Sequence, residues 1–231
     1  MLNLLVALSL AMPQLRPLFS DVARGDVSGS APIIAEFPSR QLNGSLLEAL
    51  EALPESEGLV RAARWIEAGQ YWRASETLRS EQQRLATATS PVRRSNAPWV
   101  WLLSARSTRL AATPENATTA FRTAAELLEL AAPHLESPWI GLERLALALD
   151  RSDLGGTDPA GRSVALDDAL RCYQGLPDSV QRSEDASRLA LRLFTSRGWR
   201  GRAAECARLM ITARAPLVRA YGQVATARTA P

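Results

Sequence analysis

From residue 46 onward, apolar residues recur three or four positions apart, the spacing of one face of an α-helix. Proline and glycine interrupt this pattern at short intervals, and two polar loops are predicted at residues 87–97 and 150–162. The predicted helices are 46–53, 59–68, 71–86, 98–110, 114–130, 138–149, 164–173, 185–197, 203–211 and 217–225. Since each helix is amphipathic and the breaks are short, the pattern predicts an all-α fold of stacked antiparallel helical hairpins.

Start signals support several of these boundaries. Pro98 and Ser137-Pro138 place proline in a first helical turn, where its missing N–H costs nothing. Thr113-Pro114-Glu115 adds a threonine cap and an acid near the positive end of the helix. We therefore expect the helix after residue 110 to begin at Pro114, with Thr113 as its cap.

Residues 1–12 form an uncharged apolar run that ends at Pro13. A helix of this length reaches about 18 Å, short of the ~30 Å hydrocarbon core of a bilayer. Three interpretations stay open: a signal or signal-anchor, a helix docked on a membrane or apolar partner, and a part of the core. The residues that would make the contact are Leu2, Leu4, Leu5, Val6, Leu8 and Leu10.

The chain accordingly divides into three parts: the apolar segment 1–12, an extended linker at 13–44, and a helical-repeat domain at 45–231. The linker prediction rests on its prolines and on the polar stretch 25–30. Arg16, Arg24 and Arg40 follow the apolar run and favour a cytoplasmic location for the chain after it. We predict membrane association on the extracytoplasmic side, with the cytoplasmic side as the alternative.

Two stretches of the sequence share one pattern. In both, an aromatic residue precedes a glycine by four positions, and Arg-Ala-x-Glu starts four positions after the glycine: residues 65–76 and 194–205. An alanine is also expected near the start of the second helix of each hairpin: Ala74, Ala120, Ala169 and Ala203, with 34 residues between the last two.

This arrangement resembles the tetratricopeptide family of helical repeats. Trp65, Gly69, Tyr71 and Ala74 match its aromatic, turn glycine, bulky residue and close-approach alanine. Phe194, Gly198, Trp199 (shifted by one) and Ala203 match it again, whereas the middle hairpins lack the glycine. The resemblance covers residues 55–216 and implies a concave surface that binds peptides or partner subunits; a non-repeating helical bundle is the alternative.

Charge is unevenly distributed along the chain. All 27 basic residues are arginine, as in a G+C-rich, bacterial-type coding sequence, so mechanisms that need lysine are excluded. Residues 188–231 contain nine Arg and one acid, Glu205, a net charge of +8. This end suits an acidic protein partner, with candidate contacts at Arg188, Arg192, Arg200, Arg202 and Arg208. Without interleaved aromatic platforms, nucleic acid is not the predicted partner.

The sequence indicates no catalytic, cofactor or metal site. Its one histidine, His134, follows a proline at a helix end and is expected to cap carbonyls. Cys172 and Cys206 are expected to be free thiols. Among six tryptophans, Trp72 and Trp99 are the candidates for exposed interface anchors.

Together these features predict a non-enzymatic interaction or scaffold subunit that docks on a membrane-associated assembly. The competing prediction is an accessory helical domain of a cell-envelope enzyme whose catalytic part lies on another chain. A self-contained enzyme is the third and least favoured possibility.

Overall fold

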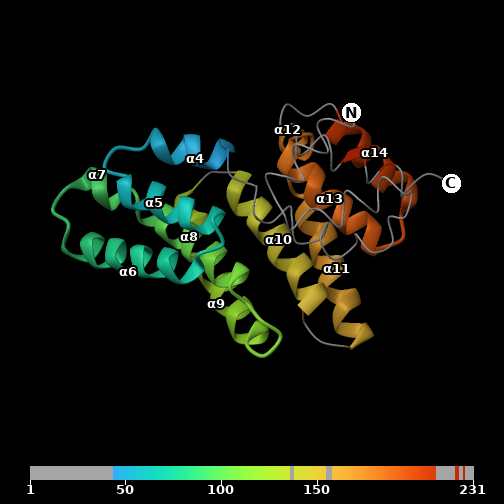
Figure 1. Cartoon of the computed structure of the whole chain (residues 1–231), viewed down its shortest axis with the longest axis horizontal. Helices are drawn as coiled ribbons and strands as arrows, with labels where there is room; N and C mark the ends of the chain where they lie inside the picture. The colour runs from blue at the N-terminus through green and yellow to red at the C-terminus, as the bar shows by residue number, and fades with distance from the viewer. Residues whose placement is uncertain (1–43, 136–137, 155–157, 212–221, 224–225, 227–231) are drawn as a thin grey trace, which may run out of the picture.

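The computed structural model describes residues 44–135, 138–154, 158–211, 222–223 and 226, and within these ranges every regular element is a helix (Figure 1). The longer helices are α4 (Gly44–Glu51), α5 (Glu57–Glu67), α6 (Tyr71–Thr87), α8 (Ala97–Leu110), α9 (Ala117–Ala131), α10 (Pro138–Leu154), α11 (Pro159–Gln174), α13 (Glu184–Ser196) and α14 (Arg200–Ile211). The short ones are α7 (Pro91–Arg94), the 3₁₀ helix η2 (Ala132–His134) and α12 (Asp178–Gln181). The predicted segment 1–12, the predicted linker 13–44 except Gly44, and most of the predicted helix 217–225 lie outside the described residues.

Consecutive helices pack as pairs. α5 packs on α6, α8 on α9, α10 on α11 and α13 on α14. The second helix of each pair also contacts the first helix of the next, and the first helices α5, α8, α10 and α13 contact one another in sequence. In Figure 1, α4 to α9 lie on one side of the molecule and α11 to α14 on the other, with α10 between them. The predicted all-helical architecture of packed hairpins is confirmed.

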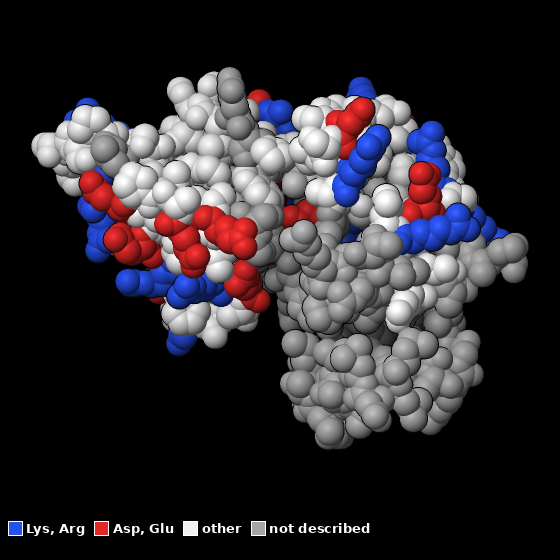
Figure 2. Space-filling view, turned by 90° about the horizontal axis from the view of Figure 1, so that it is seen from above, with Lys and Arg blue, Asp and Glu red and all other residues white. Residues whose placement is uncertain are grey.

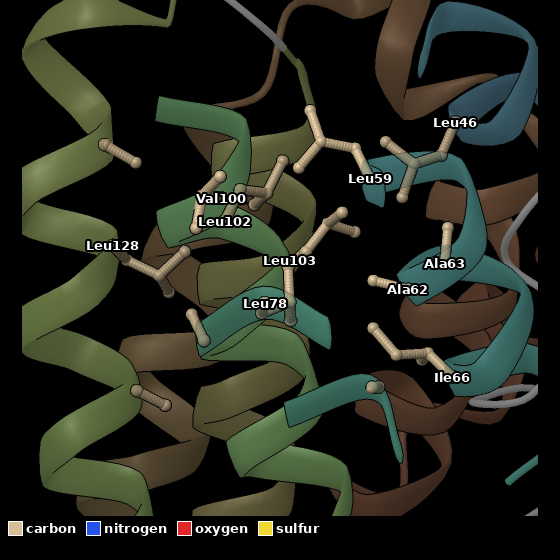
Figure 3. Packing of buried hydrophobic residues seen from close by; sticks show 14 of the residues in the cluster. Leu46, Leu59, Ala62, Ala63, Ile66, Leu78, Val100, Leu102, Leu103 and Leu128 are labelled. Carbon is tan, nitrogen blue, oxygen red and sulfur yellow. The ribbon is translucent and has the colours of Figure 1, made fainter. Parts of the chain in front are cut away.

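Two clusters of buried apolar side chains hold this arrangement together. The first spans α4 to α10; Figure 3 shows Leu59, Ala63 and Ile66 of α5 facing Leu103 of α8 within it. The second spans α10 to α14 and includes Leu145, Leu149 and Phe194. Trp139 packs against both clusters, so α10 is shared between the two halves. Removing this apolar surface from water, at about 25 cal/mol per Å², is the main force that holds the helices together.

The two stretches that share this sequence pattern form the same turn. Gly69 and Gly198 adopt left-handed backbone conformations, with φ of 69° and 71°. The N–H after each glycine donates to the carbonyl of the aromatic residue five positions earlier: Gln70 to Trp65 and Trp199 to Phe194, both at 2.8 Å. This six-to-one hydrogen bond is a Schellman closure, which glycine adopts without steric cost.

The alanines behave as predicted in only part of the chain. Ala74 and Ala203 are the fourth residues of α6 and α14 and are fully buried, which permits close helix approach. Ala120 is only partly buried, because Ala117 and Ala124 occupy the inward positions of α9 instead. Ala169 is buried but lies deep within α11, not near its start.

Several predicted boundaries are wrong. α9 begins at Ala117, because Asn116 Oδ1 accepts from the N–H of Thr113 and closes a turn over Thr113-Pro114-Glu115. α11 begins at Pro159, before the predicted start, because the Asp158 carboxylate accepts from the N–H groups of Ala160 and Gly161.

The predicted loops are also shorter in the structure. The 87–97 loop contains the single turn α7, capped by the Ser90 hydroxyl, which accepts from the N–H of Arg93. α10 continues through Asp150 and Asp153 to Leu154, where a loop was predicted. Both carboxylates form ion pairs with arginines of neighbouring helices, and these ion pairs lie in the part of α10 that extends beyond the predicted helix.

Candidate interaction site

An arginine and two tryptophans meet at the turn between α5 and α6. The guanidinium of Arg73 lies 4.9 Å from the ring centroid of Trp65 and 5.2 Å from that of Trp72. Trp65 is partly buried against the first apolar cluster, whereas Trp72 is 61% exposed. We refer to Trp65, Trp72 and Arg73 as the N-terminal turn cluster.

An equivalent cluster forms at the turn between α13 and α14. Arg202 lies 5.5 Å from the ring of Phe194 and 5.2 Å from that of Trp199, and Arg197 lies 5.3 Å from Trp199 on α13's side of the turn. The Phe194 and Trp199 rings are stacked with centroids 5.9 Å apart. Trp199 is 38% exposed. These four residues are the C-terminal turn cluster.

The spacing of the aromatic residue, the glycine and the arginine in the shared sequence pattern explains both clusters. In each, the aromatic residue four positions before the glycine packs against the core, and the arginine four positions after it lies in the first turn of the returning helix. The Schellman turn folds the second helix back, so the guanidinium reaches the ring face. Such contacts contribute about 0.5–1 kcal/mol each at exposed sites.

The predicted interface tryptophans differ in exposure. Trp72 is exposed as predicted, but Trp99 is partly buried and packs against the first apolar cluster. Trp199, which was not predicted to be an interface anchor, is more exposed than Trp99. The sequence feature that could have identified Trp199 is its position directly after the turn glycine Gly198.

The predicted basic contacts divide into two groups. Arg200, Arg202 and Arg208 lie exposed on α14. Figure 2 shows one face of the molecule, on which arginine side chains cross the part formed by the C-terminal helices and acidic side chains gather over the N-terminal part. The exposed arginines of α14 are therefore available to a partner.

Arg188 and Arg192 lie inside, contrary to the prediction that they form part of a basic surface. The Arg188 side chain is 6% exposed and pairs with Asp185 at 2.6 Å. The Arg192 side chain is 15% exposed and pairs with Asp150 at 2.7 Å and Asp153 at 2.6 Å. A charge that is buried and already paired cannot attract an acidic partner from solution.

The Arg192 pairs belong to a network that crosses three helices. Arg109 of α8 donates to Glu143 and Asp150 of α10, and Asp150 also accepts from Arg192 of α13. Burial would lower the pKa of Arg109 and Arg192, but the facing carboxylates and their hydrogen bonds raise both above the ordinary value. The network thus keeps its arginines charged and links the two halves of the stack.

Sequence reasoning missed this network. Its only sequence signal is periodic: Arg106 and Arg109 are one helical turn apart, and Glu143 and Asp150 are two turns apart, so each pair shares a helix face. Such stripes are common on solvated faces, and the sequence does not show which of them meet.

Two pockets lie on the described surface. One pocket, of about 320 Å³, lies between α5 and α6. It is lined by charged side chains, including the ion pairs Arg93–Glu55 and Arg84–Glu81. The other, of about 260 Å³, is lined by α9, α10 and α11, and Cys172 is among its lining residues.

Both cysteines are free thiols, as predicted. Burial raises the pKa of Cys172, and burial together with the charge of Glu205 raises the pKa of Cys206 to about 11. Neither thiol is therefore activated as a nucleophile at neutral pH. His134, in η2, lies with its ring centroid 6.1 Å from that of Trp101.

Within the described ranges, the helices are too short or too polar to cross a membrane. Comparisons of the chain with protein-family models, with curated proteins and with solved structures find no match.

Proposed function

We propose that this chain is a non-enzymatic interaction subunit, a tetratricopeptide-like stack of hairpins that binds a protein with an acidic surface and docks on a membrane-associated assembly. The C-terminal turn cluster carries this proposal. Trp199 is exposed between two arginines, directly before α14, which also presents Arg200 and Arg208 to solvent.

Tryptophan and arginine are the residues most enriched at the centres of protein interfaces. An aromatic ring held in place by a guanidinium loses little conformational freedom on binding, which lowers the cost of association. α14 carries a single acid, Glu205, beside its exposed arginines. A carboxylate-rich partner surface fits this arrangement of charge and apolar contact.

A co-purification experiment tests the protein partner. The full chain carrying a C-terminal tag is expressed in the cells that make it, extracted from solubilised membranes and recovered with a stoichiometric partner. The double variant Trp199→Ala, Arg202→Ala is expected to lose that partner, while Arg79→Ala, an exposed arginine of α6, retains it. Raising the salt concentration should weaken the complex, because exposed charges are screened.

Recovery of the wild-type chain alone would contradict the proposal. Retention of the partner by the double variant would place the contact elsewhere in the stack.

The membrane component rests on the apolar sequence of residues 1–12. Deleting these residues is expected to shift the chain from the membrane fraction to the supernatant after centrifugation, while the partner still binds. If the shortened chain sediments with membranes as the full chain does, the apolar segment is not the attachment.

A further inference from the structure

The pocket lined by α9, α10 and α11 is a groove over α10, which packs on both of the other helices (Figure 1). Its volume is about 260 Å³. The groove opens to solvent, because the side chains of Glu129 and Arg171, which line it, are 71% and 75% exposed. We refer to this pocket as the α10 groove. A ligand can reach it from solution.

The floor of the α10 groove is apolar. It is formed by the partly buried Ala125 and by three buried residues, Leu128, Leu147 and Ala148. Ala125 of α9 and Ala148 of α10 carry only methyl groups, so the side chains of the two helices leave space between them. A cavity of about 150 Å³ with apolar walls holds a benzene ring. The α10 groove therefore has room for an aromatic side chain together with some of its backbone.

Charged side chains surround this floor. Three arginines and two acids line the groove, which gives it a net charge of +1: Arg144, Arg151, Arg171, Glu129 and Asp168. Arg144 pairs with Glu129 at 2.7 Å, and Arg171 pairs with Asp168. Among the described residues, Arg151 forms no ion pair, and its Nη2 donates to the carbonyl of Phe121 at 3.3 Å. Arg151 thus supplies the charge that a carboxylate of a ligand can neutralise.

We infer that the α10 groove binds a segment of a partner protein that places an aromatic side chain on the floor and a carboxylate beside Arg151. Burying the ring removes apolar surface from water, and the carboxylate adds a charge-assisted hydrogen bond. Because the groove partly excludes water, this charge pair is stronger than one on an open surface. The inference goes beyond the proposed function, since the groove belongs to other helices than the C-terminal turn cluster does.

Fluorescence anisotropy with the full chain tests the inference. The probe is a fluorescein-labelled peptide in which one phenylalanine lies between two glutamates within a glycine–serine chain. Replacing its phenylalanine by serine is expected to weaken binding at least about tenfold. Arg151→Gln should bind the probe about tenfold more weakly, and should no longer distinguish it from a peptide with glutamine in place of glutamate. Arg162→Gln, exposed on α11 outside the groove, is the matched control and should bind as the wild type does.

Ala125→Leu tests the groove without changing its charge. The added atoms enter space that a ligand would occupy, so this variant is expected to lose the probe while its thermal midpoint stays close to that of the wild type. It decides the question if Arg151→Gln fails to fold, since Arg151 also bonds to the Phe121 carbonyl. Undiminished binding by Ala125→Leu, or no binding by the wild type at about 1 mM probe, overturns the inference.

Alkylation of Cys172 shows where the probe binds. Cys172 lines the groove and is partly exposed, and it is the only thiol of the chain in a Cys206→Ala variant. The probe is expected to slow its reaction with N-ethylmaleimide, followed by mass spectrometry, whereas the serine peptide should not. An unchanged rate with the probe bound means that binding occurs elsewhere, and the inference fails. The partner recovered by co-purification can be retained in that case, so the proposed function is tested separately.

Discussion

Asp150 of α10 forms an ion pair with Arg192 of α13 at 2.7 Å, and its second carboxylate oxygen accepts from Arg109 of α8. α8 belongs to the first apolar cluster and α13 to the second. One carboxylate thus ties together helices from both halves of the chain. Because the Arg109 side chain is 1% exposed, its charge is tolerated only while Asp150 and Glu143 remain.

Asp150→Ala is expected to lower the free energy of unfolding by about 3 kcal/mol, since it leaves Arg109 with one carboxylate and removes a partner of Arg192. Urea denaturation followed by circular dichroism measures the change. Asp153→Ala is the control: this carboxylate is 34% exposed, forms its ion pair with Arg192 and accepts from the Ser152 hydroxyl, so the expected loss is at most about 1 kcal/mol. Equal losses in the two variants would show that the shared carboxylate has no special role.

Gly198→Ala is expected to destabilise the chain by about 1–2 kcal/mol, because a φ of 71° forces Cβ toward the backbone. No atom lies within 4 Å of the added Cβ, so the cost is conformational and not a clash with a neighbour. Thermal unfolding measures it, and Gly69→Ala should behave the same way.

Gly201 provides the matched control for these glycine variants. It lies in α14 with open space around the Cβ position, and its φ is not positive. Gly201→Ala is therefore expected to stabilise the chain by about 0.5 kcal/mol. A stabilising Gly198→Ala would rule out the left-handed turn.

The hairpin turns could be predicted from sequence because all their determinants are local. The aromatic, the glycine and the arginine lie within nine residues, and a single helix–turn–helix geometry brings them together. The same reasoning failed for Thr113, where a cap signal competed with the turn closed by Asn116.

The buried network could not be predicted because its partners are distant in sequence. Arg109 is 34 residues from Glu143 and 41 from Asp150. Arg188 and Arg192 were assigned to the surface because charged residues are rarely buried. Only the packing of α13 on α10 shows that Arg192 faces Asp150, whereas Arg188 pairs with Asp185 of its own helix.

Arg202→Ala is expected to lower the free energy of unfolding by about 1 kcal/mol, because the side chain contacts both Phe194 and Trp199. Arg73→Ala should have a similar effect at the other turn. Arg208→Ala, exposed further along α14, should change stability by less than about 0.5 kcal/mol. If Arg202→Ala and Arg208→Ala are equally neutral, the turn clusters contribute nothing to the fold and their arginines act only at the surface.

The Cys206 thiol makes stability depend on alkaline pH. Burial and the charge of Glu205 raise its pKa from the ordinary value of 9.0 to about 11, so the folded chain favours the neutral thiol. The resulting stabilisation is fully present below about pH 9 and is lost as the pH rises through about 11. The wild type should therefore lose up to about 2 kcal/mol more than Cys206→Ala over this window, as measured by urea denaturation at each pH. The comparison between the two chains cancels the titration of groups that do not interact with Cys206, whereas parallel pH profiles would show that the thiolate is accommodated in the folded state.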